Sequence, residues 1–313
     1  MADIHEIVLL HGAERARQLV SKGKEHLVDI VARLLSEESE ELGFSYSGFC
    51  LAAFPHRKQA DDKPWKLETP RVTLLVEPGF EVRPGKEPKP VGVPYGSRSR
   101  LIMLYLQTQA VKQQSREVVL GKSMSSWMDR MGVSNGGKSY LDVREQTKRL
   151  SRCSISFHWQ DAGGAEGIAK TSIIEAGLFF SGRRSDHDQG TLWEDTVTLS
   201  EQFYRSLVKH PVPIWEPALM ALSNKSMALD AYVWLAYRLH SLKKAAPVSW
   251  PLLHQQFGAG FAALKHFQPE FKKSLEFALA VYENARVEID ATGIVLYPSP
   301  PPIPERIVPR LTR

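Results

Sequence analysis

Apolar residues recur at helical spacing near the start of the chain, across residues 4–42. Such a stripe predicts an amphipathic helical region that buries one face. Residues 44–54 and 71–77 have the pattern of strands. The stretch 84–90 is rich in Pro, Gly and Lys and predicts a linker or long loop. The inward positions expected in the helical region are Ile7, Leu10, Leu19, Leu27, Ile30, Val31, Leu34 and Leu35.

A unit with a clear order of elements follows. Its first helix carries Leu101, Leu104, Tyr105 and Ala110 on one side, and Ser123 is suited to cap its second helix. Three helices followed by a β-hairpin describe a winged helix, which contains a helix-turn-helix. The predicted elements are helix 99–114, an extended piece at 118–120, helices 123–131 and 138–151, and strands 153–159 and 168–174.

The same order of elements recurs later in the chain. Nineteen residues separate Leu101 from Leu120 in the first copy and Leu229 from Val248 in the second, which supports the parallel. Pro269 is suited to the first turn of the last helix. The predicted elements are helix 227–242, an extended piece at 247–249, helix 250–257, a glycine turn at 258–260, helix 269–284, and strands 287–289 and 294–297.

Between the copies, residues 177–181 and 193–199 can pair as strands, and 201–208 is expected to be helical. The whole pattern predicts an α+β fold of two tandem winged-helix domains with an N-terminal helical extension and a Pro-rich C-terminal tail. The tail is expected either to lie on the surface or to be disordered. The predicted regions are 1–97 (N-terminal helix, strands and linker), 98–210 (first winged-helix domain), 211–297 (second winged-helix domain) and 298–313 (tail).

Composition narrows the class of protein. The 313 residues are 43% apolar and 24% charged, which suits two packed domains better than one. The net charge of +5 favours an anionic partner. The two cysteines, Cys50 and Cys153, are too few for a disulfide framework and are expected to be buried in a protein of the reducing cytosol. No signal peptide is recognisable, and no apolar run approaches the ~20 residues that a membrane span needs.

The charge is distributed unevenly along the chain. Residues 1–43 carry five Lys or Arg and nine Asp or Glu, whereas residues 98–153 carry eleven Lys or Arg and four Asp or Glu. A basic cluster on a helix-rich unit is typical of polyanion-binding proteins. The alternative is a solvated helical face, which the scarcity of balancing acids disfavours.

The stretch GVSNGGKS at residues 132–139 fits the G-x-x-x-x-G-K-[ST] pattern of a nucleotide-binding loop. Such a loop needs a buried apolar strand directly before it. Here Trp127, Met128 and Met131 are spaced like one face of a helix instead. The pattern therefore favours a helix-turn-helix, and we expect neither enzyme activity nor a cofactor. The alternative, a nucleotide hydrolase, predicts ATP binding that Lys138→Ala abolishes.

A second fragment with chemical character is Asp186-His187-Asp188. Its residue types suit a metal, but no further ligand stands at a known spacing. A solvated loop without a metal is therefore expected.

The run GVPYGSRSRLIMLYLQTQAVKQQSREVVLGKSMSSWMDRMGVSNGGKSYLDVREQTKRLSRCSISFHW, at residues 92–159, resembles the core of plasmid-encoded RepA-type replication initiators. The upstream stretches FPHRK and WKLETPRVTLLVEPG resemble the same family, as do HPVPI and ALDAYVWLAYRL downstream. The resemblance spans roughly residues 44–290.

The resemblance implies a protein that binds repeated double-stranded DNA sites at a plasmid origin. It implies that the protein helps to open the duplex and brings host replication proteins, such as the host initiator and helicase, to the origin. It also implies two winged-helix domains, a switch between origin-binding monomers and self-repressing homodimers, no catalysis, and a cytoplasmic location with the plasmid or nucleoid. A winged-helix transcriptional repressor without an origin function is the alternative.

The third helix of the first unit is expected to enter the major groove, which is wide enough for one helix. Its start favours a phosphate because backbone amides are free there. Arg144 is the candidate for reading guanine, since its fork can bond two acceptors at once. For each residue the alternative is an ordinary solvated charge. The residues expected at DNA are Ser134, Asn135, Lys138 and Arg144, with Lys148 and Arg149 at phosphates; Tyr140, Val143, Thr147 and Leu150 are expected to face the core.

Two further groups of residues are candidates for DNA contact. Arg98 and Arg100 precede the first helix and either hold a backbone phosphate or form surface ion pairs. Gln268 is expected either to contact DNA or only to cap the last helix. The candidates in the second unit are His266, Gln268, Lys272 and Lys273, while Leu275, Ala278, Leu279 and Tyr282 are expected in its core.

Overall fold

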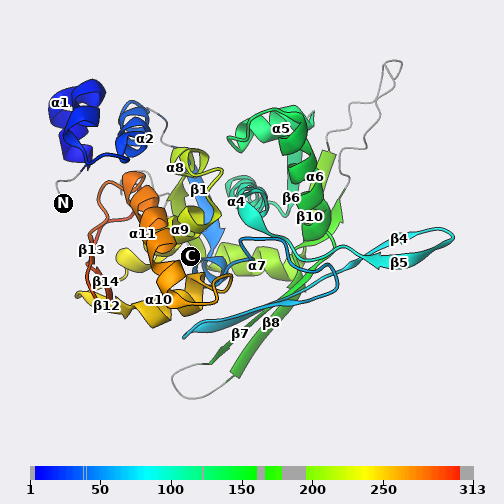
Figure 1. The fold of residues 1–313 in the computed structure, drawn as a ribbon. Helices are drawn as coiled ribbons and strands as arrows, with labels where there is room; N and C mark the ends of the chain where they lie inside the picture. The colour runs from blue at the N-terminus through cyan, green and yellow to red at the C-terminus, as the bar shows by residue number, and fades with distance from the viewer. Residues whose placement is uncertain are drawn as a thin grey trace. The chain divides into compact units, whose positions relative to one another are not determined.

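The computed structural model describes residues 4–37, 39, 41–121, 123–160, 166–177 and 195–303 (Figure 1). The chain divides into two compact units. Unit 1 combines Met1–Gly43 with Val212–Arg313, and unit 2 is Phe44–Pro211. The region 1–97, which the sequence pattern presents as one part, is therefore divided between the two units.

Unit 2 is built around α4 (Gly96–Gln113). Residues 101–106 of this helix are all buried, as expected for a helix that is apolar on every side. The ring of Trp127 in α5 packs edge-on against Tyr105, with ring centroids 6.1 Å apart. Ser123 caps α5 as predicted, because its side chain accepts a hydrogen bond from the Ser126 amide. The remaining helices of this core are α5 (Met124–Arg130), α6 (Gly137–Leu150) and α7 (Glu201–Lys209).

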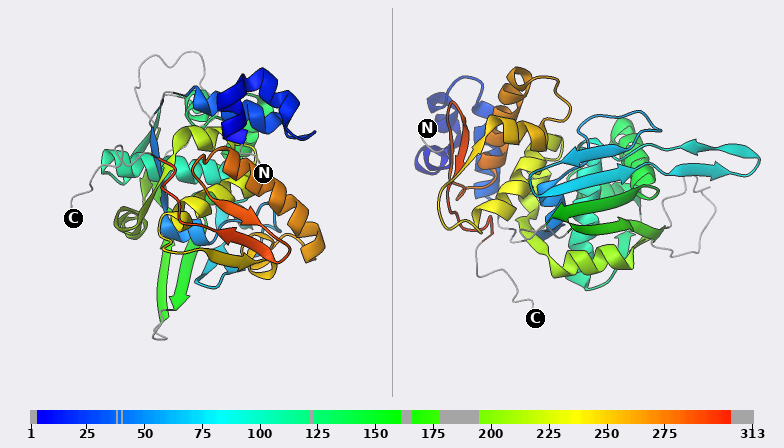
Figure 2. Two further views of the ribbon diagram at one scale, coloured as in Figure 1. Left: turned by 90° about the vertical axis from the view of Figure 1, so that its left-hand side faces the viewer. Right: turned by 90° about the horizontal axis from the view of Figure 1, so that it is seen from below.

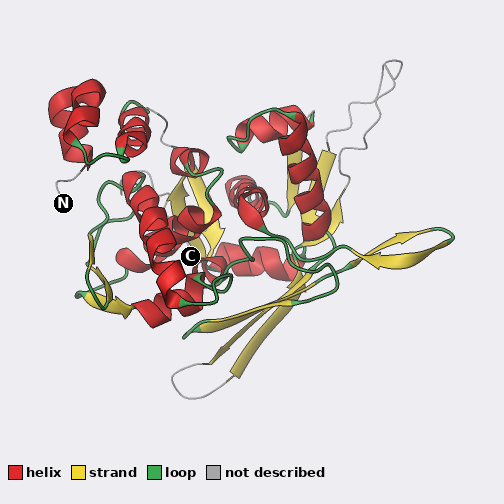
Figure 3. Ribbon diagram, viewed as in Figure 1, coloured by secondary structure: helices red, strands yellow, loops and turns green. Residues whose placement is uncertain are grey.

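A three-stranded antiparallel sheet completes this core, in the order β6-β10-β9 (Figure 3). Its strands are β6 (Glu117–Gly121), β9 (Ile174–Gly177) and β10 (Asp195–Leu199). The extended piece predicted at 118–120 is confirmed as part of β6. The predicted strand at 193–199 is confirmed over Asp195–Leu199, whereas residues 178–194 lie outside the described part of the chain.

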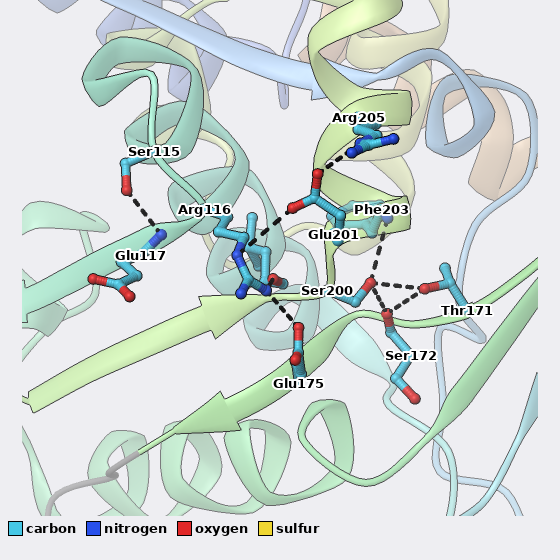
Figure 4. A network of polar contacts seen from close by, with 11 residues as sticks. Ser115, Arg116, Glu117, Thr171, Ser172, Glu175, Ser200, Glu201, Phe203 and Arg205 are labelled. Atoms are coloured by element: carbon cyan, nitrogen blue, oxygen red, sulfur yellow. Dashed lines mark hydrogen bonds and ion pairs between the residues drawn. The ribbon is translucent and has the colours of Figure 1, made fainter.

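A polar network ties this sheet to the helix that follows it (Figure 4). The Arg116 guanidinium bonds Glu175 of β9 at 2.5 Å and lies 3.7 Å from a carboxylate oxygen of Glu201 in α7. The Ser200 hydroxyl caps α7 by accepting from the Phe203 amide and donates to the carbonyl of Ser172. These contacts hold β6, β9 and α7 in one arrangement.

The strands predicted at 153–159 and 168–174 are present, but they do not lie beside β6. They form β7 (Ser154–Gln160) and β8 (Glu166–Ser172), and β7 pairs with β3 in a separate sheet of order β2-β3-β7-β8. The other strands of this sheet are β2 (Trp65–Glu68) and β3 (Val72–Glu77). Leu74 stands opposite Phe157 and Val76 opposite Ile155, and all four side chains are buried. The hairpin joins β3 because these alternating apolar faces match.

The stretch predicted as a linker is a β-hairpin instead. Its strands are β4 (Phe80–Arg83) and β5 (Lys86–Pro90). Pro84 and Gly85 form the two-residue turn, and Gly85 has a φ of +69°. Proline followed by a residue with positive φ is the sequence signature of a tight turn. The hairpin projects from the rest of unit 2 (Figures 1 and 2).

Two strands carry the chain from one unit to the other. They are β1 (Leu42–Tyr46) and β11 (Pro211–Trp215), and they form a two-stranded sheet. The strand predicted at 44–54 ends early, because the short helix α3 (Ser47–Leu51) follows β1 directly. Glycine at position 48 fits there because a Cβ atom would lie 2.4 Å from the ring of Tyr46.

Unit 1 repeats the arrangement of helices and strands seen in unit 2. Its sheet has the order β12-β14-β13 and is antiparallel. The fully buried rings of Phe267 and Phe271 pack beside each other in its core, with centroids 5.2 Å apart. The elements are α9 (Ser226–Leu239), β12 (Ala246–Ser249), α10 (Trp250–Phe257), α11 (Leu264–Ala280), β13 (Val287–Ile289) and β14 (Gly293–Leu296), preceded by α1 (Ile4–Leu19), α2 (Glu25–Leu35) and α8 (Glu216–Ala221).

The start predicted for the last helix is wrong. Helix α11 begins at Leu264, so Pro269 lies inside it and Gln268 does not cap it. Burial of Phe267 and Phe271 one turn apart outweighs the backbone hydrogen bond that proline removes. The first part of the Pro-rich tail packs on unit 1, since Ile303 is buried and the Tyr282 hydroxyl donates to the Pro300 carbonyl at 2.6 Å. Residues 304–313 lie outside the described part.

Candidate nucleic-acid interface

The glycine turn of unit 2 joins two helices, as the sequence predicts. Helix α5 precedes it, and α6 begins at Gly137. Gly132 has a φ of +64° and turns the chain, while Val133 is buried and anchors the turn. The side-chain amide of Asn135 donates to Asp129 at 2.6 Å, which links the turn back to α5.

The start of α6 is open to solvent. Ser134, Asn135 and Lys138 are all exposed, together with both glycines between them. No atom lies within 4 Å of where a Cβ atom of Gly136 or Gly137 would be. The first amides of a helix have no intrahelical acceptor and attract anions. The sequence therefore places the predicted contacts around an accessible, positively polarised helix end.

One face of α6 packs inward. Val143 and Leu150 are fully buried and Thr147 is 4% exposed, as predicted. The Thr147 hydroxyl donates a hydrogen bond to the carbonyl of Val143 at 2.8 Å. Tyr140 is only half-buried, so it lies at the edge of the face rather than in the core.

The outward face of α6 carries Lys138 and Arg144, both exposed. Neither side chain has a hydrogen bond or an ion pair within the described part of the chain. Leu141 lies between them and is 64% exposed. The acid on this face is Asp142, which is also exposed. Two uncompensated cations on an exposed helix are suited to a polyanion.

The phosphate contact predicted for Arg149 does not fit the structure. This side chain is 1% exposed, and its guanidinium bonds Asp61 and Glu145 at 2.8 Å each. It also donates to the carbonyl of Val93 at 3.1 Å and lies 5.2 Å from the ring centroid of Tyr95. Arg149 therefore fastens the segment before α4 to α6. The sequence prediction failed because helical spacing alone does not reveal a carboxylate 88 residues earlier.

Arg100 is also buried, at 5% exposed. Its guanidinium donates to the carbonyls of Phe54 and Gly96 at 2.6 Å and 2.7 Å, so it closes a loop rather than facing solvent. Arg98 is half-buried, and burial lowers the pKa of its guanidinium against the opposing charge of Asp142. Both residues lie in the first turns of α4 rather than before the helix, and Arg98 alone stays a predicted phosphate contact.

Lys148 pairs with a carboxylate from the β4–β5 hairpin. Its Nζ atom lies 2.7 Å from Glu81 on β4, and Arg83 lies 2.8 Å from the same carboxylate. The hydrogen bonds from Lys148 and then Arg83 lower the pKa of Glu81 to about 2. A groove of about 620 Å³ lies beside this cluster, lined by both hairpin and helix residues. The alternation of Phe80 and Val82 before Pro-Gly is the signal that could have revealed the hairpin.

In unit 1, the exposed candidates gather on the first half of α11. His266, Lys272 and Lys273 are exposed, and the Lys272 ammonium lies 5.2 Å from the ring centroid of Trp250. Gln268 is half-buried within the helix.

The second half of α11 is covered. Leu275 and Ala278 are buried as predicted, as is Tyr282, whereas Leu279 is half-buried. Lys24 in the loop before α2 pairs with Glu276 at 2.7 Å, which adds to this cover.

The family model described as "Plasmid encoded RepA protein" matches residues 93–251, which include α4, the glycine turn and α6. The chain belongs to this family. The match in this RepA-family chain spans half its length, and it extends from unit 2 into α10 of unit 1.

Solved structures resemble the RepA-family chain in fold. The crystal structure of selenomethionine derivatives of domains 2 and 3 of RctB has a TM-score of 0.52 and 11% identity, covering 81% of this chain and 98% of that one. A second structure of RctB domains 2-3 has a TM-score of 0.49 and 11% identity, covering 79% and 94%. No curated protein matches the chain.

The described residues of this RepA-family chain contain no group of three His, Cys, Asp or Glu side chains that could hold a metal ion. The fragment Asp186-His187-Asp188 lies outside them. None of the helices within the described ranges is both long and apolar enough to cross a membrane.

Proposed function

We propose that the chain is a plasmid replication initiator that binds repeated double-stranded DNA sites at its origin. Membership of the RepA family supports the replication context. The observation that carries DNA binding is the open face of α6, where Lys138 and Arg144 are exposed and have no partner within the described residues. When exposed cations such as these bind DNA, counterions are released from its phosphates.

Both units are proposed to be winged helices. Unit 1 runs helix, strand, helix, helix, strand, strand, and unit 2 has the same order with β7 and β8 inserted between α6 and β9. The sheets have equivalent orders, β6-β10-β9 and β12-β14-β13. Such a plan presents its third helix, here α6 or α11, to the major groove. In unit 1 the exposed residues His266, Lys272 and Lys273 would then lie at DNA.

The glycine turn has a specific task in this proposal. Open amides at the start of α6 donate to a phosphate of the DNA backbone, with Ser134, Asn135 and Lys138 around it. Arg144 lies about one and a half turns further along and reads a guanine through two donors. The motif that resembles a nucleotide-binding loop thus binds a nucleic acid instead.

The remaining parts of the proposed function concern later steps. We propose that the bound protein helps to open the origin duplex and brings the host initiator and helicase to it, and that a homodimer represses its own gene. We assign no surface to these partners. Catalysis and a cofactor form no part of the proposal.

Titration of labelled duplexes tests DNA binding. Origin fragments with direct repeats are expected to bind more tightly than scrambled ones, with an affinity that falls steeply with salt. Lys138→Ala/Arg144→Ala is expected to lower the salt slope by about 1, since Lys138 loses one phosphate contact worth about 0.9, and to lose about 1–3 kcal/mol of binding free energy at the guanine that Arg144 reads. The matched control is Lys66→Ala/Arg71→Ala, two exposed cations on β2 and the turn after it. Binding that ignores salt would contradict the proposal.

Two further measurements separate the alternatives. A transcriptional repressor without an origin function would bind a promoter, yet a plasmid lacking the gene would still be maintained. A nucleotide hydrolase would bind ATP and lose that binding in Lys138→Ala. We expect that a plasmid without the gene is not maintained, and that neither the unchanged protein nor Lys138→Ala binds ATP.

A further inference from the structure

The β4–β5 hairpin is exposed along nearly its whole length. Phe80 is 57% exposed and Val82 is 73% exposed, and Arg83, Lys86, Glu87 and Lys89 are exposed as well. Because these residues are exposed, packing in the core does not explain the length of the hairpin. With four residues in β4, it reaches about 13 Å from its base, more than the ~7.5 Å depth of a minor groove.

The tip of the hairpin is cationic. Glu81 stands opposite Lys89 and Arg83 stands opposite Lys86, and the register shifts between Glu81 and Arg83. Residues directly opposite each other in an antiparallel pair have neighbouring side chains, so Arg83 and Lys86 bring two cations together beside the turn. Phe80 and Val82 add exposed apolar side chains on β4.

The base of the hairpin is fixed beside α6. Glu81 accepts from Lys148 at 2.7 Å, and the Val91 amide donates to the Gly79 carbonyl at 2.9 Å. A Cβ atom at Gly79 would lie 2.0 Å from the carbonyl oxygen of Arg152, so only glycine permits this approach. The base of the hairpin, and with it the cationic tip, is therefore held in one place relative to the helix proposed to bind DNA.

The groove between hairpin and helix is lined by four cations and three acids. Arg83, Arg144, Lys148 and Arg152 line it, together with the acids Glu81, Asp142 and Glu145. Glu81 is already paired with two cations, and Glu145 with the buried Arg149. Asp142 is thus the one lining acid without a cation bonded to it in the described residues, whereas Arg144 and Arg152 have no carboxylate partner there.

We infer that this hairpin is a second DNA-binding element, and this inference rests on the proposed function. With α6 in the major groove, the adjoining phosphate backbone lies in the groove between α6 and the hairpin. The turn then reaches the flanking minor groove, where Arg83 and Lys86 meet the negative potential of a narrow A·T-rich segment. Phe80 and Val82 pack against deoxyribose on the way. The ligand is duplex DNA beyond the bases that α6 reads.

The double variant Lys86→Ala/Lys89→Ala tests the inference. Both lysines are exposed and have no partner in the described residues, so the fold is unaffected. The probe is a duplex of about 30 base pairs, roughly three helical turns, selected by the full chain from a random pool. We expect a roughly tenfold loss of affinity near 0.15 M salt and a salt slope lower by about 2. Lys66→Ala/Arg71→Ala, on the neighbouring hairpin β2–β3, is expected to bind like the unchanged protein.

A base-substitution series locates the contact. Replacing flanking A·T pairs by G·C adds an amino group to the minor groove, whereas inosine·C leaves that groove as in A·T. The unchanged protein is expected to lose affinity on G·C flanks but not on inosine·C flanks, and the hairpin variant is expected to bind all three alike.

The outcomes separate this inference from the proposed function. If the unchanged chain binds no duplex, the proposed function fails. If it binds, but the hairpin variant has the same affinity and salt slope, only the hairpin inference is overturned. Loss of self-association in the variant with DNA binding intact would assign the hairpin to a protein partner and would also overturn it.

Discussion

The third helices of the two units, α6 and α11, occupy equivalent places but distribute their cations differently. On α6 the cations range from exposed Lys138 and Arg144 to Arg149, which is 1% exposed. On α11 the cations Lys272 and Lys273 are exposed in the first half, and the second half is covered. Helix α6 thus carries exposed and buried cations along its length, whereas the exposed cations of α11 lie in its first half.

The difference arises from what each unit adds around the plan. Unit 2 adds the sheet β2-β3-β7-β8 and the β4–β5 hairpin. It also adds Asp61, in the loop before β2, which forms an ion pair with the buried Arg149. Unit 1 adds α1 and α2, and Lys24 and His26 contact the distal part of α11. The neighbours of a cation, more than its position on the helix, decide whether it serves the fold or a ligand.

The largest expected effect distinguishes the two classes of arginine on α6. Arg149→Ala leaves Asp61 and Glu145 without their shared cation and is expected to lower the free energy of unfolding by about 3–5 kcal/mol. Arg144→Ala, on the same helix but exposed, is expected to change it by at most about 0.5 kcal/mol. Urea denaturation of both variants measures this. Equal losses of stability in the two variants would contradict the distinction between a structural and an exposed arginine.

A pair of glycines sharpens the same point. Gly92 has a φ of +79°, and a Cβ atom there would lie 2.0 Å from a guanidinium nitrogen of Arg149. Gly92→Ala is therefore expected to cost about 3 kcal/mol or more, from backbone strain and displacement of the arginine. Gly85→Ala, with a φ of +69° and open space around it, is expected to cost about 1–2 kcal/mol. Thermal unfolding compares them, and similar losses would argue against a tightly packed Arg149.

A smaller effect concerns α11. Lys272→Ala/Lys273→Ala is expected to lower the salt slope of DNA binding by about 2 with little change in stability. Lys272 loses only its contact with Trp250, worth about 0.5–1 kcal/mol at an exposed site. The double variant Lys243→Ala/Lys244→Ala, between α9 and β12, provides a control of equal charge. If neither double variant changes the salt slope, α11 does not contact DNA.

The smallest effect is pH-dependent and belongs to unit 2. The pKa of Glu81 is lowered to about 2 by its hydrogen bonds from Lys148 and Arg83. Its stabilisation is therefore present above the ordinary carboxyl value and is lost as pH falls toward 2. We expect Glu81→Gln to be less stable than the unchanged protein at pH 7 and equal to it near pH 2. A difference that persists at low pH would show that the ion pairs are not its cause.

The sequence predicts much of the helical framework, because the apolar spacing around Trp127 and Val143 is local information. The glycine turn was placed correctly for the same reason. Pairing partners were harder to foresee, since β7 joins β3 through contacts about 80 residues apart in the chain. The sequence does not reveal that Arg100 and Arg149 are buried, because their acceptors, at Phe54 and Asp61, come from distant loops. Pro269 misled the placement of α11, because aromatic burial outweighed the local preference of proline.

Unit 1 is assembled from segments on either side of unit 2, and this has a consequence for synthesis on the ribosome. Helices α1 and α2 emerge first, but α11, which supplies Ala280 to His5 and Glu276 to Lys24, is translated more than 200 residues later. All of unit 2 can fold in the meantime, since domains fold as units while the chain is made. Helix α1 already packs on α2, but the part of α2 that contacts α8 and α11 stays uncovered until they are made. A stalled or shortened nascent chain would therefore expose that part to chaperones and proteases.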